Sequence, residues 1–336
     1  MAWSRFIAFD DPFHYQSAIR AGDWEIFPTV KGQFRAELTQ VVMNELWMQR
    51  FSEELPRVHK GAINSGRKVI TFPTERQPEI YNRGRLLSFG EMCADDYEVQ
   101  HSRTTGHFRF GAVSLRPEEL VAACKAIAGC EFDAESGKRY VRPNPTLMEQ
   151  FLNLHKMVAD LARTKPERFE IREVVRALEQ QLTHQLVRCL TDGIISTRNR
   201  RILRHEVIIA RFEEFLEANP NTPLYLTEVC AAIGTAERTL RNACEGHVGM
   251  GPIRYLTLRR MHLVRRALTR AAPSTTTVTR IATDHGFWEL GRFAVAYRTL
   301  FGETPSATLS RPPDEYPDFP SHPSPLHSYL VGHCSS

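Results

Sequence analysis

No apolar run in this chain of 336 residues approaches the ~20 residues that a membrane-spanning helix needs. The segment Met1–Asp11 also lacks the basic-then-apolar pattern of a secretory signal. The hydrophobic fraction of 42% and the charged fraction of 24% are typical of soluble proteins. The sequence therefore predicts a cytoplasmic protein without a membrane partner, long enough for two or three domains.

Side-chain clusters that carry chemistry are also missing. The seven cysteines include no CxxC pair, so we expect reduced structural thiols rather than disulfides or a zinc site. The histidines of the first third do not form the HxH pattern with downstream Glu and His of a metal-binding cupin; they are His14, His59, His101 and His107. No Ser/His/Asp or Cys/His constellation and no glycine-rich phosphate loop occurs. We expect no metal, no cofactor and no enzymatic activity.

Lysine is absent from the C-terminal third, because all seven lysines precede Ser196. Residues 196–312 hold 17 arginines and 10 acidic residues, which gives a formal net charge of +7, whereas the rest of the chain has a formal net charge of −3. Arginine suits bidentate contact with phosphates and guanine edges. The surplus is compatible either with nucleic-acid binding or with a solvated helical surface.

Residues 1–140 are predicted to be mostly strand, arranged as a sandwich or small barrel. The strand segments mix alternation with β-branched and aromatic residues, and they are Gly32–Leu38, Gln40–Met48, Lys68–Phe72 and His107–Val113. A short helix is expected at Arg116–Cys124, with proline in its first turn.

From Asn144 to Asp192 the apolar period becomes helical, with one helix through 147–161 and a second through 174–190. These two helices either pack on the barrel or form a dimer seam. A linker is expected at Asn199–Arg201 and a helix at His205–Ala218. Residues 312–336 are rich in proline, serine and histidine, and their composition predicts a disordered tail.

Two similar segments follow, Leu226–Thr235 and Val278–Phe287. In each, a small residue precedes a glycine by four positions, as in Cys230 with Gly234. The small side chain lets two helices cross closely, and glycine tolerates a left-handed turn between them. Each segment is followed by a large apolar anchor, Leu240 or Phe293. The repeat predicts two helix-turn-helix units, joined by a helix of about 27 Å and able to enter successive segments of the DNA major groove.

Residues Ile209–Ser310 resemble the AraC/XylS family of bacterial transcription regulators. The resemblance is carried by Ile281-Ala282, Gly286-Phe287, Arg292-Phe293, Tyr297-Arg298, Phe301-Gly302 and Thr304-Pro305, and in the first unit by Gly249–Pro252, Tyr255-Leu256 and Arg259-Arg260. The N-terminal part resembles, more weakly, the cupin-like effector-binding barrel of many members.

The resemblance implies an α+β multidomain chain. Its parts would be an N-terminal cupin-like β-barrel as effector-binding domain (1–140), a helical linker (144–195), and an all-α DNA-binding domain with two helix-turn-helix units (204–311). The implied function is sequence-specific regulation of transcription, controlled by a small-molecule effector. A homodimer would bind paired operator half-sites in double-stranded DNA, in the bacterial cytoplasm and associated with the nucleoid, with RNA polymerase as a further partner. The alternatives are a non-specific DNA-binding protein and, from another class, a cupin-type enzyme or binding barrel.

The first recognition helix would turn Glu237, Arg238, Arg241 and Asn242 outward. By resemblance, its two arginines and Asn242 align with the base-reading positions of the family. Arginine can pair with guanine and asparagine with adenine. Thr235 is expected either to cap this helix or to bond a phosphate.

The second recognition helix offers fewer polar groups. Glu289 and Arg292 are its candidates for base contact, and Arg298 and Thr304 its candidates for backbone contact. Where many family members carry polar base readers, this chain has Gly291, Ala294 and Val295. The second unit would therefore contribute a phosphate clamp, an apolar contact to a thymine methyl group, or shape readout. Trp288 is expected either to be buried beneath the turn, which is the favoured interpretation, or to stack on a sugar of the DNA.

The effector site is not identified by any motif. The aromatic residues of the N-terminal part either line a pocket or form barrel core, which is the favoured interpretation; they are Trp24, Phe27, Phe72, Tyr81 and His101.

Overall fold

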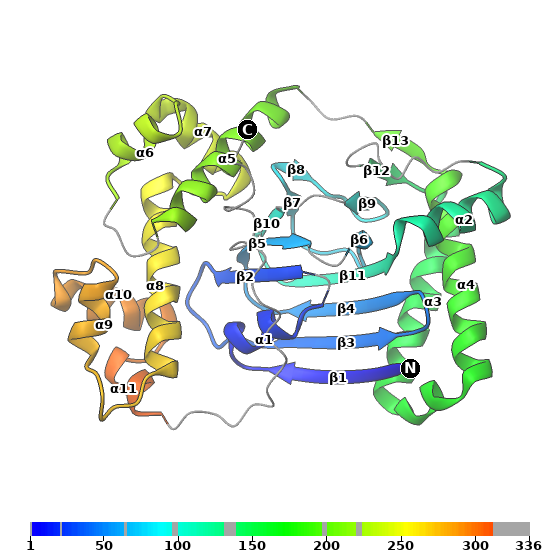
Figure 1. Ribbon diagram of the computed structural model, residues 1–336, viewed down its shortest axis with the longest axis horizontal. Coiled ribbons are helices and arrows are strands. Elements are labelled where there is room, and N and C mark those ends of the chain that lie inside the picture. Colours follow the sequence, from blue (N-terminus) through cyan, green and yellow to red (C-terminus); the bar gives the residue numbers. More distant parts are fainter. Residues whose placement is uncertain are drawn as a thin grey trace, which may run out of the picture.

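The computed structural model describes residues 2–20, 22–63, 66–95, 100–130, 139–196, 200–219 and 224–311. A β-rich domain occupies the middle of the molecule, with helices α3 (Pro145–Thr164) and α4 (Arg172–Thr191) on one side and the C-terminal helical domain on the other (Figure 1). The expected order of a β-rich domain followed by helices is confirmed. The predicted tail at 312–336 lies outside the described residues.

Two antiparallel sheets form the β-rich domain. The larger sheet has the order β1 (Trp3–Phe9), β3 (Ala36–Val42), β4 (Trp47–Glu53), β11 (Phe108–Leu115), β6 (Lys68–Pro73), β9 (Met92–Asp95), β12 (Arg139–Arg142) and β13 (Ile194–Ser196). The smaller sheet has the order β2 (Gly22–Pro28), β5 (Arg57–Ile63), β10 (Gln100–Thr104), β7 (Ile80–Asn82) and β8 (Arg85–Leu86). None of the six cysteines among the described residues forms a disulfide.

One predicted strand boundary is wrong. The sequence pattern predicts two strands that divide near position 39, but β3 runs through to Val42. The chain turns at Met43–Leu46, where the Met43 amide donates to the Leu46 carbonyl at 3.0 Å. The turn is held from outside, because the Glu179 carboxylate of α4 accepts from the Glu45 and Leu46 amides at 2.6 and 2.8 Å. A contact between residues so far apart in the chain leaves no local signal.

A first apolar core lies between strands of both sheets and includes Phe9, Ile26, Leu38, Ile80 and Phe110. The helix α1 (Pro12–Ala18) adds Tyr15, whose hydroxyl donates to the buried Glu53 carboxylate at 2.9 Å. Glu53 also pairs with Arg57 at 2.6 Å, and Arg57 lies over the Phe108 ring. The inside of the β-rich domain therefore contains a paired charge, as buried ions require.

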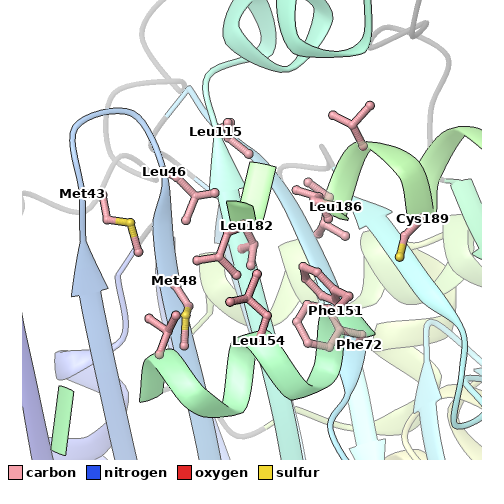
Figure 2. Close-up of a cluster of buried hydrophobic side chains, with 14 of the residues drawn as sticks. Met43, Leu46, Met48, Phe72, Leu115, Phe151, Leu154, Leu182, Leu186 and Cys189 are labelled. Carbon is pink, nitrogen blue, oxygen red and sulfur yellow. The ribbon is translucent and has the colours of Figure 1, made fainter. Parts of the chain in front are cut away.

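A second core lies on the outer face of the larger sheet, beneath α2 (Pro117–Ala128), α3 and α4 (Figure 2). The Phe72 ring of the sheet meets the Phe151 ring of α3 edge-on, with 5.0 Å between centroids. The short 3-10 helix η1 (Pro166–Glu170) joins α3 to α4 and buries Phe169. Most of the apolar side chains of α3 and α4 are thus covered within one chain, whereas Met157 of α3 is exposed. Phe72, a pocket candidate from the sequence, belongs to this outer core.

The C-terminal domain is all-α, as predicted. Its helices are α5 (Arg200–Ala218), α6 (Leu226–Ala232), α7 (Glu237–His247), α8 (Pro252–Arg270), α9 (Val278–Asp284), α10 (Leu290–Phe301) and α11 (Pro305–Ser310). The helix expected from His205 begins at Arg200 instead. In Figure 1 the long helix α8 runs from the α6–α7 pair to the α9–α11 group.

The two domains share an apolar boundary. Phe27 of β2 and Val58 of β5 pack into the core of the first helical unit, with Phe212 and Tyr255 among its members. Phe27, a further pocket candidate, therefore faces the helical domain. The neighbouring residue Ile26 lies in the inter-sheet core, since successive side chains of a strand point to opposite faces.

Buried ion pairs cross the same boundary. The Lys60 ammonium lies 2.8 Å from a Glu213 carboxylate oxygen, and the two side chains are only 5% and 2% exposed. Glu217 is a second partner of Lys60. Burial alone would raise the pKa of Glu213, but Lys60 and His101 lower it to about 2. The charge pair is therefore maintained at neutral pH.

Loss of the Lys60 ammonium should destabilise the chain strongly. Lys60→Met leaves Glu213 buried without its main cation, which costs about 3–5 kcal/mol of unfolding free energy. Chemical unfolding followed by circular dichroism measures the loss. Lys156→Met, at an exposed position of α3, is the matched control and should change stability by less than about 1 kcal/mol. Equal stabilities for the two variants would contradict this account.

Acidification should also weaken the fold through three histidines at the domain boundary. Burial lowers the pKa of His101 and His247 to about 4 and that of His262 to about 3, from an ordinary value of 6.5. Between pH 6.5 and about 4 the unfolded chain binds protons that the folded chain does not, so the unfolding free energy falls as pH falls. Glu213 stays charged across this window.

Urea unfolding at about pH 7.5 and about pH 5 tests this expectation. His262→Gln removes one titrating ring while retaining a donor for the Pro28 carbonyl, which the His262 ring contacts at 3.2 Å. Its loss of stability on acidification should be smaller than that of the wild type. The exposed control His184→Gln should behave like the wild type, and a pH-independent stability would refute the prediction.

Candidate nucleic-acid interface

The first helix-turn-helix unit has the turn that the sequence predicts. Gly234 adopts φ 65°, and the Thr235 amide then donates to the Cys230 carbonyl at 3.0 Å. The expected capping role of Thr235 is wrong: the cap residue of α7 is Ala236, which makes no side-chain cap bond. The turn is one residue longer than the sequence predicted, so Thr235 lies one position before the cap position of α7.

The second unit repeats this geometry. Gly286 adopts φ 78°, and the Phe287 amide donates to the Ala282 carbonyl at 3.0 Å. The small residue of each unit thus accepts the bond that closes its turn. Thr277 caps α9 by accepting from the Arg280 amide at 3.2 Å.

The first recognition helix, α7, buries Leu240, Ala243, Cys244 and His247 against the rest of its unit. All four predicted base-contact residues of this helix are exposed; they are Glu237, Arg238, Arg241 and Asn242. The helix therefore brings them together on its solvent side. Arg241 and Glu237 form an ion pair at 2.6 Å, with Arg241 52% exposed. A pair so exposed contributes at most about 1 kcal/mol, so the guanidinium can leave it for a stronger acceptor.

The second recognition helix, α10, buries Phe293 and Tyr297. The predicted contact residues Glu289 and Arg292 are exposed and pair at 2.8 Å, with Arg292 84% exposed. Arg298 is exposed as well. Thr304 is exposed but already caps α11, accepting from the Ala307 amide at 3.2 Å, so a phosphate contact would compete with that bond.

The expectation that Trp288 is buried is wrong, because its side chain is 68% exposed. The space beneath this turn is filled by Phe287, whose ring centroid lies 4.9 Å from that of Phe293. The Arg260 guanidinium lies over the Phe287 ring. Two neighbouring aromatic residues compete for one cavity, and their order in the chain does not reveal which of them fills it.

Arg280, which no sequence motif singled out, is an exposed residue in the first turn of α9. The first helix of a helix-turn-helix unit crosses the DNA backbone, so Arg280 is a further candidate for phosphate contact. Its position three residues after the cap Thr277 is the signal that could have identified it.

Helix α8 fixes the two units relative to one another. Its first half contributes Tyr255, Leu256 and Leu258 to the core of the first unit, and its second half contributes Met261, Val264 and Leu268 to that of the second. With 19 residues it is about 28 Å long. This length is close to the ~34 Å between successive major-groove faces.

Within the described ranges, no group of three or more His, Cys, Asp or Glu side chains is placed to hold a metal ion. None of the described helices is both long and apolar enough to cross a membrane. The strongest candidate site is formed by the faces of α7 and α10, because their arginines are exposed.

The left-handed turn of the first unit yields a stability test. Gly234→Ala places a Cβ at φ 65°, which costs about 1–2 kcal/mol although no atom lies within 4 Å of it. Gly246→Ala, inside α7 and equally unobstructed, should instead stabilise the chain by up to about 1 kcal/mol. Thermal unfolding measures both variants. Destabilisation of equal size in the two would show that the conformation at Gly234 is not the cause.

Comparison with known proteins matches the segment that carries both recognition helices. A family model described as a helix-turn-helix domain matches residues 229–311. The chain is 36% identical over 100 residues to XylDLEGF operon transcriptional activator 2 of Pseudomonas putida, covering 30% of this chain and 64% of that protein. It is 31% identical over 145 residues to a probable thc operon regulatory protein of Rhodococcus erythropolis, covering 41% of this chain and 44% of that protein. The chain thus spans between 44% and 64% of the length of these curated relatives.

A solved structure adds one further similarity. The chain is 35% identical to a probable AraC family transcriptional regulator from Rhodopseudomonas palustris CGA009, with 31% of this chain and 98% of that chain covered and a TM-score of 0.29. The matched residues 229–311 contain both left-handed turns and the helix α8 that joins the two units. On the family model and the curated relatives, the C-terminal domain of this chain is a tandem helix-turn-helix domain of the AraC/XylS family of transcription regulators.

Proposed function

We propose that the chain is a sequence-specific transcription regulator that binds double-stranded DNA through α7 and α10. The observation that carries this proposal is the exposed face of α7, on which Arg238, Arg241 and Asn242 stand without burial in the protein. These side chains match the donor and acceptor patterns of guanine and adenine in the major groove. Arg298 and Arg280 would contact phosphates and fix the register of the protein on the duplex.

The β-rich domain is the proposed site of a small-molecule effector. Support comes from its connection to the helical domain: strands β2 and β5 carry residues of the inter-sheet core and of the first unit's core side by side, as in Ile26 and Phe27. A ligand that moved either strand would shift side chains packed against α5 and α8. Such a ligand changes DNA binding only if it binds one position of the strand more tightly than the other.

We further propose a homodimer on paired half-sites, acting in the bacterial cytoplasm at the nucleoid, with RNA polymerase as a further partner. The surface formed by α3 and α4 would supply the dimer contact through the exposed Met157 and Ile171. A dimer would place its two DNA-binding domains on two half-sites of one operator, whose symmetry mirrors that of the protein.

A non-specific DNA-binding protein is the alternative that one observation favours. Helix α10 offers only Glu289 and Arg292 as exposed polar groups near its start. If this helix contributed no sequence preference, half of the interface would be indifferent to sequence. An enzyme or binding barrel is less well supported, because the family model that matches residues 229–311 describes a helix-turn-helix domain.

Selection of bound DNA from a random pool by the full chain tests the proposal, at fixed physiological salt. We expect a motif that spans two major-groove segments, with a preference over random DNA of order 10³ or more. Arg241→Ala should relax the preference at one or two base pairs by about 5- to 150-fold each, equivalent to about 1–3 kcal/mol. Arg298→Ala should weaken binding to all sequences alike. It should also reduce the slope of log K against log salt concentration by about one, the value of one phosphate contact.

The control is Lys125→Ala, which removes an exposed cation from α2, a helix on the far side of the β-rich domain from the helical domain (Figure 1). It should leave both affinity and preference unchanged. Recovery of no motif, with binding that only weakens as salt rises, would leave the non-specific alternative. An unchanged preference in Arg241→Ala would overturn the assigned face of α7.

A further inference from the structure

The two recognition helices present different chemistry at corresponding positions. Helix α7 begins three residues before its buried anchor Leu240, and α10 begins three residues before its anchor Phe293. Counting from the anchors pairs the residues of the two helices as follows: Arg238 with Gly291, Arg241 with Ala294, and Asn242 with Val295. At each of these three positions the first helix has a polar side chain, whereas the second has glycine or an apolar residue.

The apolar residues of α10 point away from the protein. Val295 follows Phe293 by two positions, about 200° around the helix, and is therefore opposite the buried side. Its side chain is 68% exposed. Gly291 lies one turn earlier on the same face, and a Cβ added there would have no atom within 4 Å. The helix is therefore narrow and apolar along this face, and nothing in the described protein covers it.

Arginines flank this apolar face. Arg292 is 84% exposed and Arg298 is exposed beside Val295, and residues 196–312 carry a formal net charge of +7. A protein partner with an apolar surface would have to leave these cations solvated, whereas a polyanion neutralises them. The face also continues the interface proposed above, since α8 holds α7 and α10 in one rigid unit. Charge and continuity both favour duplex DNA as the occupant.

The thymine C5-methyl is the apolar group that bases present in the major groove. We propose that α10 reads thymine methyl groups through Val295, while Gly291 and Ala294 let the helix approach the base edges closely. The inference rests on the proposed function and assigns the second unit a specificity that α7 does not share. The preferred site would then contain thymines in one segment and polar-edge contacts in the other.

Replacement of thymine by deoxyuridine tests this inference, because it removes the methyl and retains the hydrogen-bonding groups. The probe is the duplex selected from the random pool, with the segment read by α7 identified as the one in which Arg241→Ala relaxes the preference. Deoxyuridine is placed in one segment or the other, and binding to the full chain is measured by fluorescence anisotropy at constant salt. We expect each contacted thymine in the second segment to contribute about three- to fivefold in Kd. Replacement in the first segment should have no effect.

The variant Val295→Ala assigns the effect to α10. It removes two methyl groups from an exposed side chain, so the fold is retained, and the effect of deoxyuridine should fall below about twofold. Val207→Ala, at an exposed valine of α5, is the matched control and should keep the full effect. An effect of deoxyuridine that persists unchanged in Val295→Ala would overturn the assignment.

Failure of this inference differs from failure of the proposed function. A selected motif whose affinity does not respond to deoxyuridine in the second segment would overturn methyl readout and leave specific binding through α7 intact. The apolar face of α10 would then await another occupant. A pool that yields no motif would overturn both.

Discussion

Helix α8 is the element on which the C-terminal domain depends, because its side chains complete two separate cores. Tyr255 and Leu256 lie in the first core, while Val264 and Leu268 lie in the second. A helix-turn-helix unit is too small to bury its own apolar surface, and each large side chain that α8 supplies contributes about 1.5–3 kcal/mol of burial. The same packing prevents the two recognition helices from moving independently. The spacing between the two recognition helices is thus a consequence of core formation.

The boundary between the domains combines apolar packing with buried charge. Phe27 and Val58 extend the first helical core into the β-rich domain, and Lys60 with Glu213 pairs charges beside them. A buried ion pair of this kind tolerates little change in distance, since separation leaves each charge without its partner. The boundary therefore favours discrete arrangements of the two domains over gradual displacement. A change in one domain that breaks these contacts would therefore alter the position of the other domain.

The two recognition helices illustrate how a duplicated unit diverges. Their turns are closed by equivalent bonds, from Thr235 to Cys230 and from Phe287 to Ala282. Their inner faces are likewise equivalent, with Leu240 and Phe293 as anchors. The divergence is confined to the outer faces, where packing imposes no constraint.

Sequence alone determined the helix-turn-helix units, because glycine at the turns and apolar anchors at helical spacing are local requirements, met at Gly234 and Gly286. It likewise determined which residues of α7 face outward. Only the tertiary structure decided that Phe287 rather than Trp288 fills the space beneath the second turn, and that α3 and α4 cover the larger sheet. It also decided the pairing of Lys60 with Glu213 and of the Glu45 turn with Glu179. These outcomes depend on contacts between residues distant in the chain, which compete for the same space or charge and leave no pattern in the local sequence.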